Sequence, residues 1–418
     1  MNPGKLQVDR DGDRIRIAGA LVLRSFRRVL AAIHQVTHDK GFVDVTLDLS
    51  AATYVAPGPM LAVLAACDRL RDEMDVNFSL IRPKEGEVRR LFSNANWAHL
   101  LTPSKFPPST WSPTDVMPAR RFASPDEQGG IVNSILDAVL SSGAGLSREN
   151  LAAFEWAINE ITDNVLQHAN CPQGGLVQLS QYSGSQEVEF VVADAGRGIP
   201  TTMRTARTGI SDAEALTLSI ERGITRDNDA GQGNGLFGTQ RAARVGTGRF
   251  AIHSGYASVG SDFDARMEAA PVGGTLVVVR LDYSDPDALW RAIPALAGFR
   301  ELSGDYVENR YEHETDDVLH FVVKREADSV GSRSAGRLVR SKLQSLMSMY
   351  ANYPVHVDFD GISVISSSFA DEFLGKLFVR IGALQFMSTI HLTGVSPAVR
   401  SLLDQAIFQR VHQETDEK

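Results

Sequence analysis

The chain has 418 residues, with 43% hydrophobic and 22% charged residues and a formal net charge of −9. This length allows two or three domains, and the acidic balance disfavours a general nucleic-acid-binding protein, because phosphate contacts need clustered Lys and Arg. No apolar run approaches the roughly 20 residues of a membrane span, and the N-terminus has no apolar signal core. Cys67 and Cys171 are too few for a disulfide framework or a cysteine zinc site. We therefore expect a cytoplasmic protein with neither a membrane nor a nucleic acid as partner.

Residues 1–101 are predicted to form one α/β domain. Segments with strand-like alternation are separated by longer segments with helical spacing. Strands that alternate with helices indicate a partly parallel sheet covered by helices. The predicted elements are a strand pair, LQVDR and RIRIA, around the Asp11–Gly12 turn, then a helix over 25–38, a strand over 43–49, a helix over 60–71, a strand over 76–81 and a helix over 85–96.

Residues 102–125 are predicted to be a proline-rich linker. Prolines at this density exclude a regular helix or a central strand. We expect the stiffness of the segment to set the spacing of the two domains that it joins. The prolines are Pro103, Pro107, Pro108, Pro113, Pro118 and Pro125.

A long helix is predicted over 147–170. Apolar residues recur there at three- and four-residue steps and form one buried face, and Ser147 is a suitable N-cap. Glu160, Asn164 and His168 are four residues apart and lie along one side of the helix. A carboxylate and an amide one turn apart can hold a metal ion and a water, although a solvated polar face has the same pattern. The apolar residues are Leu151, Phe154, Ile158, Ile161 and Val165.

Glycine-containing motifs follow this helix in a fixed order. A predicted strand over 187–193 leads to DAGRGIP at 194–200, AGQGNGLFG at 230–238 opens a helix, and GGT at 273–275 leads into the strand LVVVRL. A single glycine cluster is weak support for a site, because glycines also mark ordinary turns. The ordered series ExxxN, DxGxGIP, GxGxGL and GGT is much harder to obtain by chance.

Together with Glu160 and Asn164, these motifs resemble the GHKL-type ATP-binding domain shared by heat-shock chaperones, DNA gyrase B, MutL and histidine kinases. The chain resembles the anti-sigma-factor serine kinases most closely. The resemblance covers residues 122–283 and implies a GHKL α/β sandwich (the Bergerat-type fold) over 126–285, beginning with a helix over 126–140. It also implies ATP and Mg²⁺ as cofactors.

The resemblance implies a role for each matching side chain. Asn164 takes the position of the Mg²⁺ ligand, and an amide oxygen suits that hard ion. Glu160 takes the position of the general base, and a carboxylate can accept a proton from water or a serine hydroxyl. Asp194 matches the aspartate that binds the adenine amino group, supported through water by Thr275. The alternative for Asp194 is that it only caps a turn.

The glycines of the motifs are expected to admit the nucleotide. Gly196 and Gly198 let the backbone lie against the base, where a Cβ would collide. The later glycines form a flexible lid, and the helix after them points its first amides at phosphate; a mobile surface loop is the alternative. These lid and helix residues are Gly231, Gly233, Gly235 and Leu236.

The C-terminal part is predicted to be a connecting segment, 286–331, followed by a second α/β domain over 332–410. The connecting segment is expected to hold a strand pair, 306–312 with 318–324. The elements expected in the domain are a helix over 338–350, a strand over 355–359, a helix over 369–381, a strand over 389–393 and a helix over 397–407, with Ser396 before Pro397 at its first position.

The two terminal domains resemble each other and the STAS fold of anti-sigma-factor antagonists. When Asp48 is aligned with Asp358, the strand, the loop and the next helix match in length. Residues 56–59 of the N-terminal copy read APGP and offer no hydroxyl, so this copy is expected to be a docking or scaffold domain. The STAS resemblance implies a protein partner, and a homodimer is left open.

The C-terminal copy has serines where antagonists carry their phospho-acceptor. Ser367 falls at the acceptor position, but Ser366 replaces the family's aspartate and Phe369 its glycine. We therefore predict an unmodified Ser367. Ser368 and Asp371 have the spacing of a capping box, and we predict that they open the helix at 369.

These inferences converge on a Mg-ATP-binding GHKL protein. We expect an ATPase or a serine kinase of the anti-sigma-factor type, in which the nucleotide state controls the contacts of the STAS-like domains. A non-catalytic ATP-dependent switch or scaffold is the alternative. A histidine kinase is disfavoured, because residues 119–165 contain no histidine that could accept phosphate.

Overall fold

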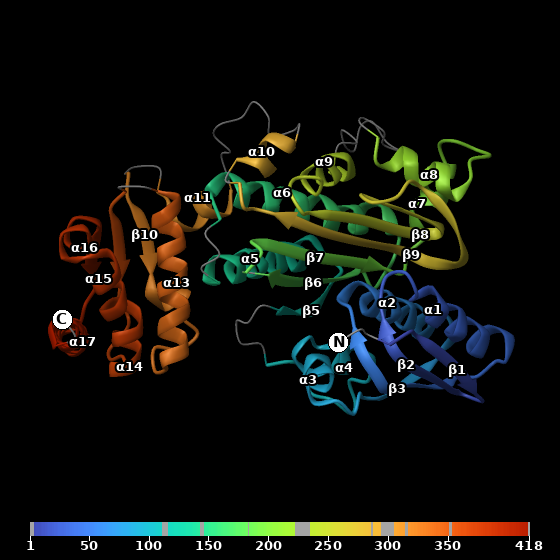
Figure 1. The fold of residues 1–418 in the computed structure, drawn as a ribbon, viewed down its shortest axis with the longest axis horizontal. Helices are drawn as coiled ribbons and strands as arrows, with labels where there is room; N and C mark the ends of the chain where they lie inside the picture. The colour runs from blue at the N-terminus through green and yellow to red at the C-terminus, as the bar shows by residue number, and fades with distance from the viewer. Residues whose placement is uncertain are drawn as a thin grey trace. The chain divides into compact units, whose positions relative to one another are not determined.

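The structure is a computed structural model, which describes residues 4–110, 116–142, 146–182, 184–221, 235–285, 287–293, 305–313, 317–350 and 353–416. The chain divides into two compact units (Figure 1). The first contains Met1–Val132 and Trp156–Gly298, and the second contains Asn133–Glu155 and Phe299–Lys418.

The N-terminal domain of the first unit is an α/β domain with a four-stranded sheet of order β1-β2-β3-β4. The first two strands form the predicted antiparallel hairpin, and the other pairs are parallel. A short helix, α4, was not predicted, because five residues are too few to show a helical period. The elements are β1 (Gln7–Asp11), β2 (Arg14–Leu21), α1 (Arg27–His34), η1 (Gln35–Asp39), β3 (Asp44–Val55), α2 (Pro57–Met74), β4 (Asn77–Ile81), α3 (Gly86–Asn94) and α4 (Trp97–Leu101).

The rest of the first unit is built on a five-stranded antiparallel sheet of order β5-β6-β7-β9-β8. Strands β6 and β7 are buried along almost their whole length, so both faces of this sheet are covered. The elements are β5 (Val116–Phe122), α5 (Pro125–Ser141), α6 (Arg148–Asn164), η2 (Val165–Ala169), β6 (Gly175–Tyr182), β7 (Glu187–Asp194), α7 (Gly198–Arg204), α8 (Asp212–Ser219), α9 (Gly235–Ala242), β8 (Arg249–Gly260), β9 (Arg266–Asp282) and α10 (Ala288–Ala292).

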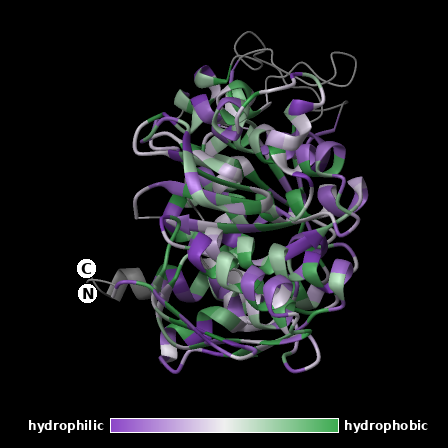
Figure 2. Cartoon of the chain, turned by 90° about the vertical axis from the view of Figure 1, so that its right-hand side faces the viewer, coloured by the Kyte–Doolittle hydropathy of each residue, from purple (hydrophilic) through white to green (hydrophobic). Residues whose placement is uncertain are grey.

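One face of the five-stranded sheet is covered by the N-terminal domain. Helices α1 and α2 lie between the two sheets and contact β6, β7 and β9 (Figures 1 and 2). A Cβ at Gly58 of α2 would lie 2.9 Å from the Val278 side chain, and Trp97 donates a buried 2.7 Å hydrogen bond to Gln178. The apolar residues that the sheet adds to the core of the N-terminal domain include Leu176, Val191, Ala193, Leu276 and Val278.

This packing corrects the predicted linker. The domains on either side of residues 102–125 share a core, so proline stiffness does not set their spacing. The end of the segment is strand β5, an edge strand paired with β6, and its register shifts between Met117 and Arg120, around Pro118. Proline is tolerated at a sheet edge, where its missing N–H faces no partner strand. Pro125 begins α5, a position that also requires no N–H donor.

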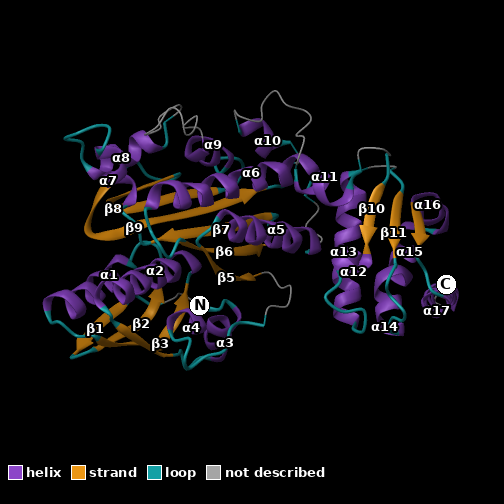
Figure 3. Cartoon of the chain, turned by 180° about the vertical axis from the view of Figure 1, so that it is seen from behind, coloured by secondary structure: helices purple, strands orange, loops and turns teal. Residues whose placement is uncertain are grey.

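The second unit contains a three-stranded parallel sheet of order β10-β11-β12 (Figure 3). Its elements are α11 (Tyr306–Tyr311), β10 (Leu319–Val322), α12 (Val323–Glu326), α13 (Arg333–Met349), β11 (Val355–Asp358), α14 (Ser367–Ala370), η3 (Asp371–Gly375), α15 (Lys376–Ile381), α16 (Ala383–Thr389), β12 (Ile390–Thr393) and α17 (Pro397–Asp416). The division between the units falls within helices α5 and α6, so that one part of each helix belongs to the first unit and the other part to the second.

The predicted strand pair in the connecting segment is wrong. Its first half is helix α11, which begins after Asp305 because that side chain accepts a hydrogen bond from the Glu308 amide (2.8 Å). Its second half contains β10, which pairs in parallel with β11. The sheet of the C-terminal domain therefore starts before the predicted boundary at residue 332.

The predicted cap of the helix after β11 is also wrong. Ser366, not Ser368, is the N-cap, and its hydroxyl accepts from the Phe369 amide at 3.0 Å. Ser368 lies inside α14, and Asp371 binds Arg410 instead of closing a capping box. Three consecutive serines leave the cap position undetermined by sequence alone.

The internal repeat has a structural counterpart. The Asp48 carboxylate accepts from the Ser50 amide, and the Asp358 carboxylate accepts from the Asp360 amide, both at 3.0 Å. Each aspartate thus fixes the same local turn in its own domain.

Candidate functional site

Helix α6 carries the predicted metal ligand and base. Ser147 caps it by accepting from the Asn150 amide (3.0 Å), as predicted. Glu160 and Asn164 are half-buried in the second half of the helix, one turn apart. The helix continues into the π-helical turn η2 and ends at Asn170, which has a left-handed φ of 51°. The structure therefore confirms the helix predicted over 147–170.

Asp194 lies at the end of β7, and its side chain is almost fully buried, with 6% exposed. The carboxylate accepts hydrogen bonds from the backbone amides of Gly196 (2.8 Å) and Thr275. Burial raises the pKa of Asp194 to about 6, although the two amides favour the charged form. The bond to Gly196 is a turn cap, so Asp194 caps its turn whether or not it also binds a base.

Ser254 of β8 connects the first and last glycine motifs through hydrogen bonds, although it belongs to no recognisable sequence motif. Its fully buried hydroxyl donates to the Gly274 carbonyl (2.7 Å) and accepts from the Ile199 amide (3.0 Å). It also lies 3.2 Å from the Thr275 hydroxyl. The only signal was a serine within a strand of mostly apolar residues.

The glycines of the first motif lie in close contact with other parts of the chain. A Cβ at Gly196 would collide with the carbonyl oxygen of Ala169 in η2. Gly198 has φ +76°, and a Cβ there would lie 2.7 Å from the Ser254 hydroxyl. Contacts within the chain therefore exclude a side chain at both positions, and the predicted approach of the backbone to a base stays a prediction.

The first turn of α9 lies against the predicted base. A Cβ at Gly235 would collide with the Glu160 carboxylate. Burial, and secondarily the charge of Asp163, raises the pKa of Glu160. Within the described part of the chain, no hydrogen bond or ion pair of the Glu160 side chain is found. Leu236 follows in the same turn, and the predicted lid residues Gly231 and Gly233 lie outside the described residues.

The residues around Glu160 fit a magnesium ion that completes its shell with phosphate and water. Asn164 would supply an amide oxygen to the ion, and Glu160, one turn earlier, would lie beside it as a carboxylate without a cation partner among the described residues. Mg²⁺ prefers few protein ligands, all oxygen, and keeps several waters.

His168 is the third residue on the predicted polar side of the helix. Its carbonyl oxygen accepts from the Arg197 side chain (2.9 Å), and the next carbonyl, of Ala169, accepts from the Arg197 amide (2.9 Å). The π-helical turn thus fixes the loop after Asp194 through backbone groups.

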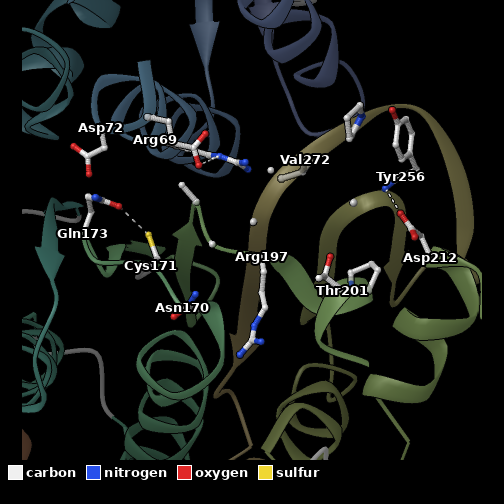
Figure 4. A pocket seen from close by; sticks show the side chains of 18 of the residues that line it. Arg69, Asp72, Asn170, Cys171, Gln173, Arg197, Thr201, Asp212, Tyr256 and Val272 are labelled. Carbon is white, nitrogen blue, oxygen red and sulfur yellow. Dashed lines mark hydrogen bonds and ion pairs between the residues drawn. The ribbon is translucent and has the colours of Figure 1, made fainter. Parts of the chain in front are cut away.

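A cavity of about 790 Å³ lies beyond this loop (Figure 4). It shares Gly196 and Gly274 with the motifs, but its lining includes none of Glu160, Asn164 and Asp194. Its other walls include Arg69 of the N-terminal domain. The lining of this cavity is therefore separate from the predicted catalytic side chains.

Comparison with protein families agrees with two parts of this architecture. Residues 122–243 match the family of histidine kinase-like ATPase domains, and residues 335–400 match a STAS-like domain of unknown function. The first match includes Glu160, Asn164 and Asp194 and ends before Thr275. No curated protein matches the chain. In the described residues, no helix has the length and apolar character of a membrane span.

Proposed function

We propose that the chain binds Mg-ATP and acts as an ATPase or as a protein serine kinase of the anti-sigma-factor type, with Glu160 as its general base. The observation that carries this proposal is the half-buried Glu160 carboxylate, which meets the first turn of α9 and has no partner among the described residues. Leaving a carboxylate partly desolvated and unpaired costs stability, and carboxylates in this condition are concentrated at functional sites. Glu155, at the same burial one and a half turns earlier on α6, instead accepts a hydrogen bond from the Tyr306 amide (3.1 Å).

The raised pKa of Glu160 suits proton transfer. A general base works best when its pKa lies close to the operating pH. Glu160 would accept the proton of water in hydrolysis, or of a serine hydroxyl in phosphotransfer. Asn164 would hold Mg²⁺, which when bound neutralises charge on the phosphates.

Asp194 would read adenine through its carboxylate. The two backbone amides orient the side chain, and Thr275 lies beside it in the register of β7 and β9. An ionised Asp194 accepts from the adenine amino group. Ser254 would act as a positioning residue, because it ties Ile199, Gly274 and Thr275 together without being an expected ligand.

Helix α6 offers a route by which nucleotide state could control the C-terminal domain. Its first turns belong to the second unit, where Arg148 binds Asp305 (3.2 Å) and Glu312 (3.1 Å). Glu155 accepts there from the Tyr306 amide (3.1 Å). The later turns of the same helix carry Glu160 in the first unit, so ATP-linked changes at Glu160 would arise on an element that the second unit also contains.

The same arrangement favours the alternative function, an ATP-dependent switch without turnover. The N-terminal domain fits a scaffold in either case. Its Gly58 and Pro59, at the position aligned with the acceptor loop, are buried, and Gly58 packs against β9. Both functions therefore predict that a protein partner contacts the C-terminal STAS-like domain.

Incubation with γ-radiolabelled ATP and Mg²⁺ separates these functions. Free phosphate indicates an ATPase, labelled protein a kinase, and neither product a switch. Glu160→Gln keeps the size of the side chain, and we expect it to lower turnover about 10²–10⁴-fold while ATP still binds. Glu149→Gln, in the first turn of the same helix, is the matched control. Turnover at the parental rate in Glu160→Gln would remove Glu160 as the base.

A further inference from the structure

Four histidines form a row across the sheet of the second unit. His320, His356 and His391 occupy paired positions on β10, β11 and β12. Neighbouring rings are 5.4 Å apart between the first pair and 5.6 Å apart between the second, centre to centre. His313 continues the row, with its ring 4.2 Å from that of His320. These residues, which we call the histidine row, are four of the ten histidines in the chain.

The histidine row lies on the accessible side of the sheet. Residues alternate between the faces of a strand, and the positions next to each histidine, such as Leu319, Val355 and Ile390, are buried. The rings of the row are half-buried or exposed, and His391, on the edge strand, is exposed. The row can therefore be reached from solvent.

The spacing of the rings fits shared coordination of one metal ion. Paired residues on adjacent strands are about 4.8 Å apart. With metal–nitrogen distances of about 2.0–2.1 Å, two imidazoles on one tetrahedral or octahedral ion have ring centres about 4.5–5.5 Å apart. The observed distance of 5.4 Å lies at the upper end of this range and that of 5.6 Å lies just above it, so a small rotation of the rings is needed to bring neighbouring imidazoles onto one ion. Exposure on the surface of a sheet does not by itself require histidine at paired positions on three neighbouring strands.

We propose that the histidine row binds a divalent transition-metal ion, with His356 as the ligand shared by its two neighbours. Imidazole is a preferred ligand of Zn²⁺, Ni²⁺ and Cu²⁺, whereas Mg²⁺ prefers oxygen. The site is thus chemically distinct from that of Asn164 and Glu160. In the described residues, no three potential ligands are arranged around one point. The imidazoles therefore turn about their side-chain torsions on binding, and water completes the shell.

A second histidine pair must be removed before this site can be measured. His34 and His38 are exposed, stand one helical turn apart, and stack at 4.1 Å. Two histidines at this spacing on a helix can also chelate a metal ion. The full chain with His34→Ala is therefore the parent for all titrations.

The test is calorimetric titration of Ni²⁺ into this parent and into two further variants. We expect one saturable site in the parent, and a loss of affinity in His356→Ala greater than the roughly 10–100-fold effect of removing an outer-shell partner. His391→Ala, on the exposed edge strand, should weaken binding less. Circular dichroism establishes that each variant is folded, and His412→Ala, on α17, is the control. If the parent shows no saturable site, or if His356→Ala and His391→Ala both bind like the parent, the proposal is wrong.

Discussion

The N-terminal domain and the C-terminal STAS-like domain share a turn built on an aspartate, yet they make opposite kinds of contact with their surroundings. The N-terminal domain shares an apolar core with the five-stranded sheet. The second unit instead contains a buried ionic network, in which Glu326 binds Arg310 (2.9 Å) and Lys342 (2.8 Å), and Lys342 also binds Asp137 of α5 (3.2 Å). Large apolar interfaces are permanent, whereas polar ones are typical of domains that move. The comparison accords with the proposed scaffold role of the N-terminal domain, and a responsive C-terminal domain remains part of the proposal.

The largest expected effect comes from a substitution of Arg27, a buried polar residue that joins the N-terminal domain to the five-stranded sheet. Its guanidinium donates to the carbonyls of Gly255 (2.9 Å), Ala257 (2.7 Å) and Ala270 in the β8–β9 hairpin. Arg27→Ala leaves these carbonyls without their donor, and we expect the free energy of unfolding to fall by about 3–5 kcal/mol. ATP affinity should fall with it, because the scaffold supports the sheet. Urea denaturation and calorimetry measure the two effects.

Arg28→Ala is the matched control on the same helix, since Arg28 is exposed and donates to the Leu6 carbonyl within its own domain. If Arg27→Ala and Arg28→Ala had equal effects, the anchoring role of Arg27 would be lost.

Lys342→Met tests the ionic network of the second unit. Glu326 is buried, and although burial opposes ionisation, Lys342 and Arg310 hold its pKa below the usual value. Removing Lys342 should destabilise the second unit by about 3 kcal/mol, the low end for a broken buried pair, because Arg310 remains. The stability that Glu326 provides is present above its unfolded pKa and is lost as the pH falls through its folded value.

Chemical denaturation at neutral and acidic pH measures this contribution. Lys324→Met, at an exposed position, should be neutral. An equal loss of stability in both lysine variants would argue against a network that depends on burial.

A third prediction concerns the ionisation of Asp194, which lies in the part of the molecule that the N-terminal domain supports. Its folded pKa of about 6 is above the ordinary value, so ionisation is completed only as the pH rises past 6. Since adenine needs the ionised acceptor, ATP affinity should fall as the pH drops from 7 to 5. Asp194→Asn should lower affinity roughly tenfold to a hundredfold at pH 7, for a lost bond of about 1.5–3 kcal/mol, and remove the pH dependence.

Asp282→Asn provides the control for this titration. Asp282 is equally buried but accepts from Thr247 at the other end of β9, and its pKa is lowered. ATP affinity that is unchanged in Asp194→Asn would exclude Asp194 from the adenine site.

The smallest expected effect distinguishes Ser366 from Ser368. Ser366→Ala removes the observed cap of α14 and should cost about 0.5–2 kcal/mol. Ser368→Ala should cost less, although the sequence predicted the reverse. Ser367→Ala should leave ATP turnover nearly unchanged, and mass spectrometry after incubation with Mg-ATP should find Ser367 unmodified. Thermal denaturation ranks the three variants, and a larger loss in Ser368→Ala would restore the sequence-based cap.

Local patterns predicted the elements that carry the site. The apolar period of α6, the strand before Asp194 and the order of the glycine motifs all depend on residues close together in sequence. Ser254 and Arg27 could not be found in this way, because their partners lie up to 243 positions away. Helix α11 was missed because one cap, at Asp305, outweighed a weak strand pattern.

The core shared by the N-terminal domain and the five-stranded sheet decides which fragments of this protein can be produced. A fragment limited to residues 122–283 contains every motif of the predicted site, but it exposes to water the face of the sheet that includes Leu176, Val191 and Leu276. Contiguous apolar surface of that kind promotes aggregation. Solubility of the motif-bearing segment is thus a property encoded largely by the first hundred residues, which hold none of the predicted nucleotide contacts.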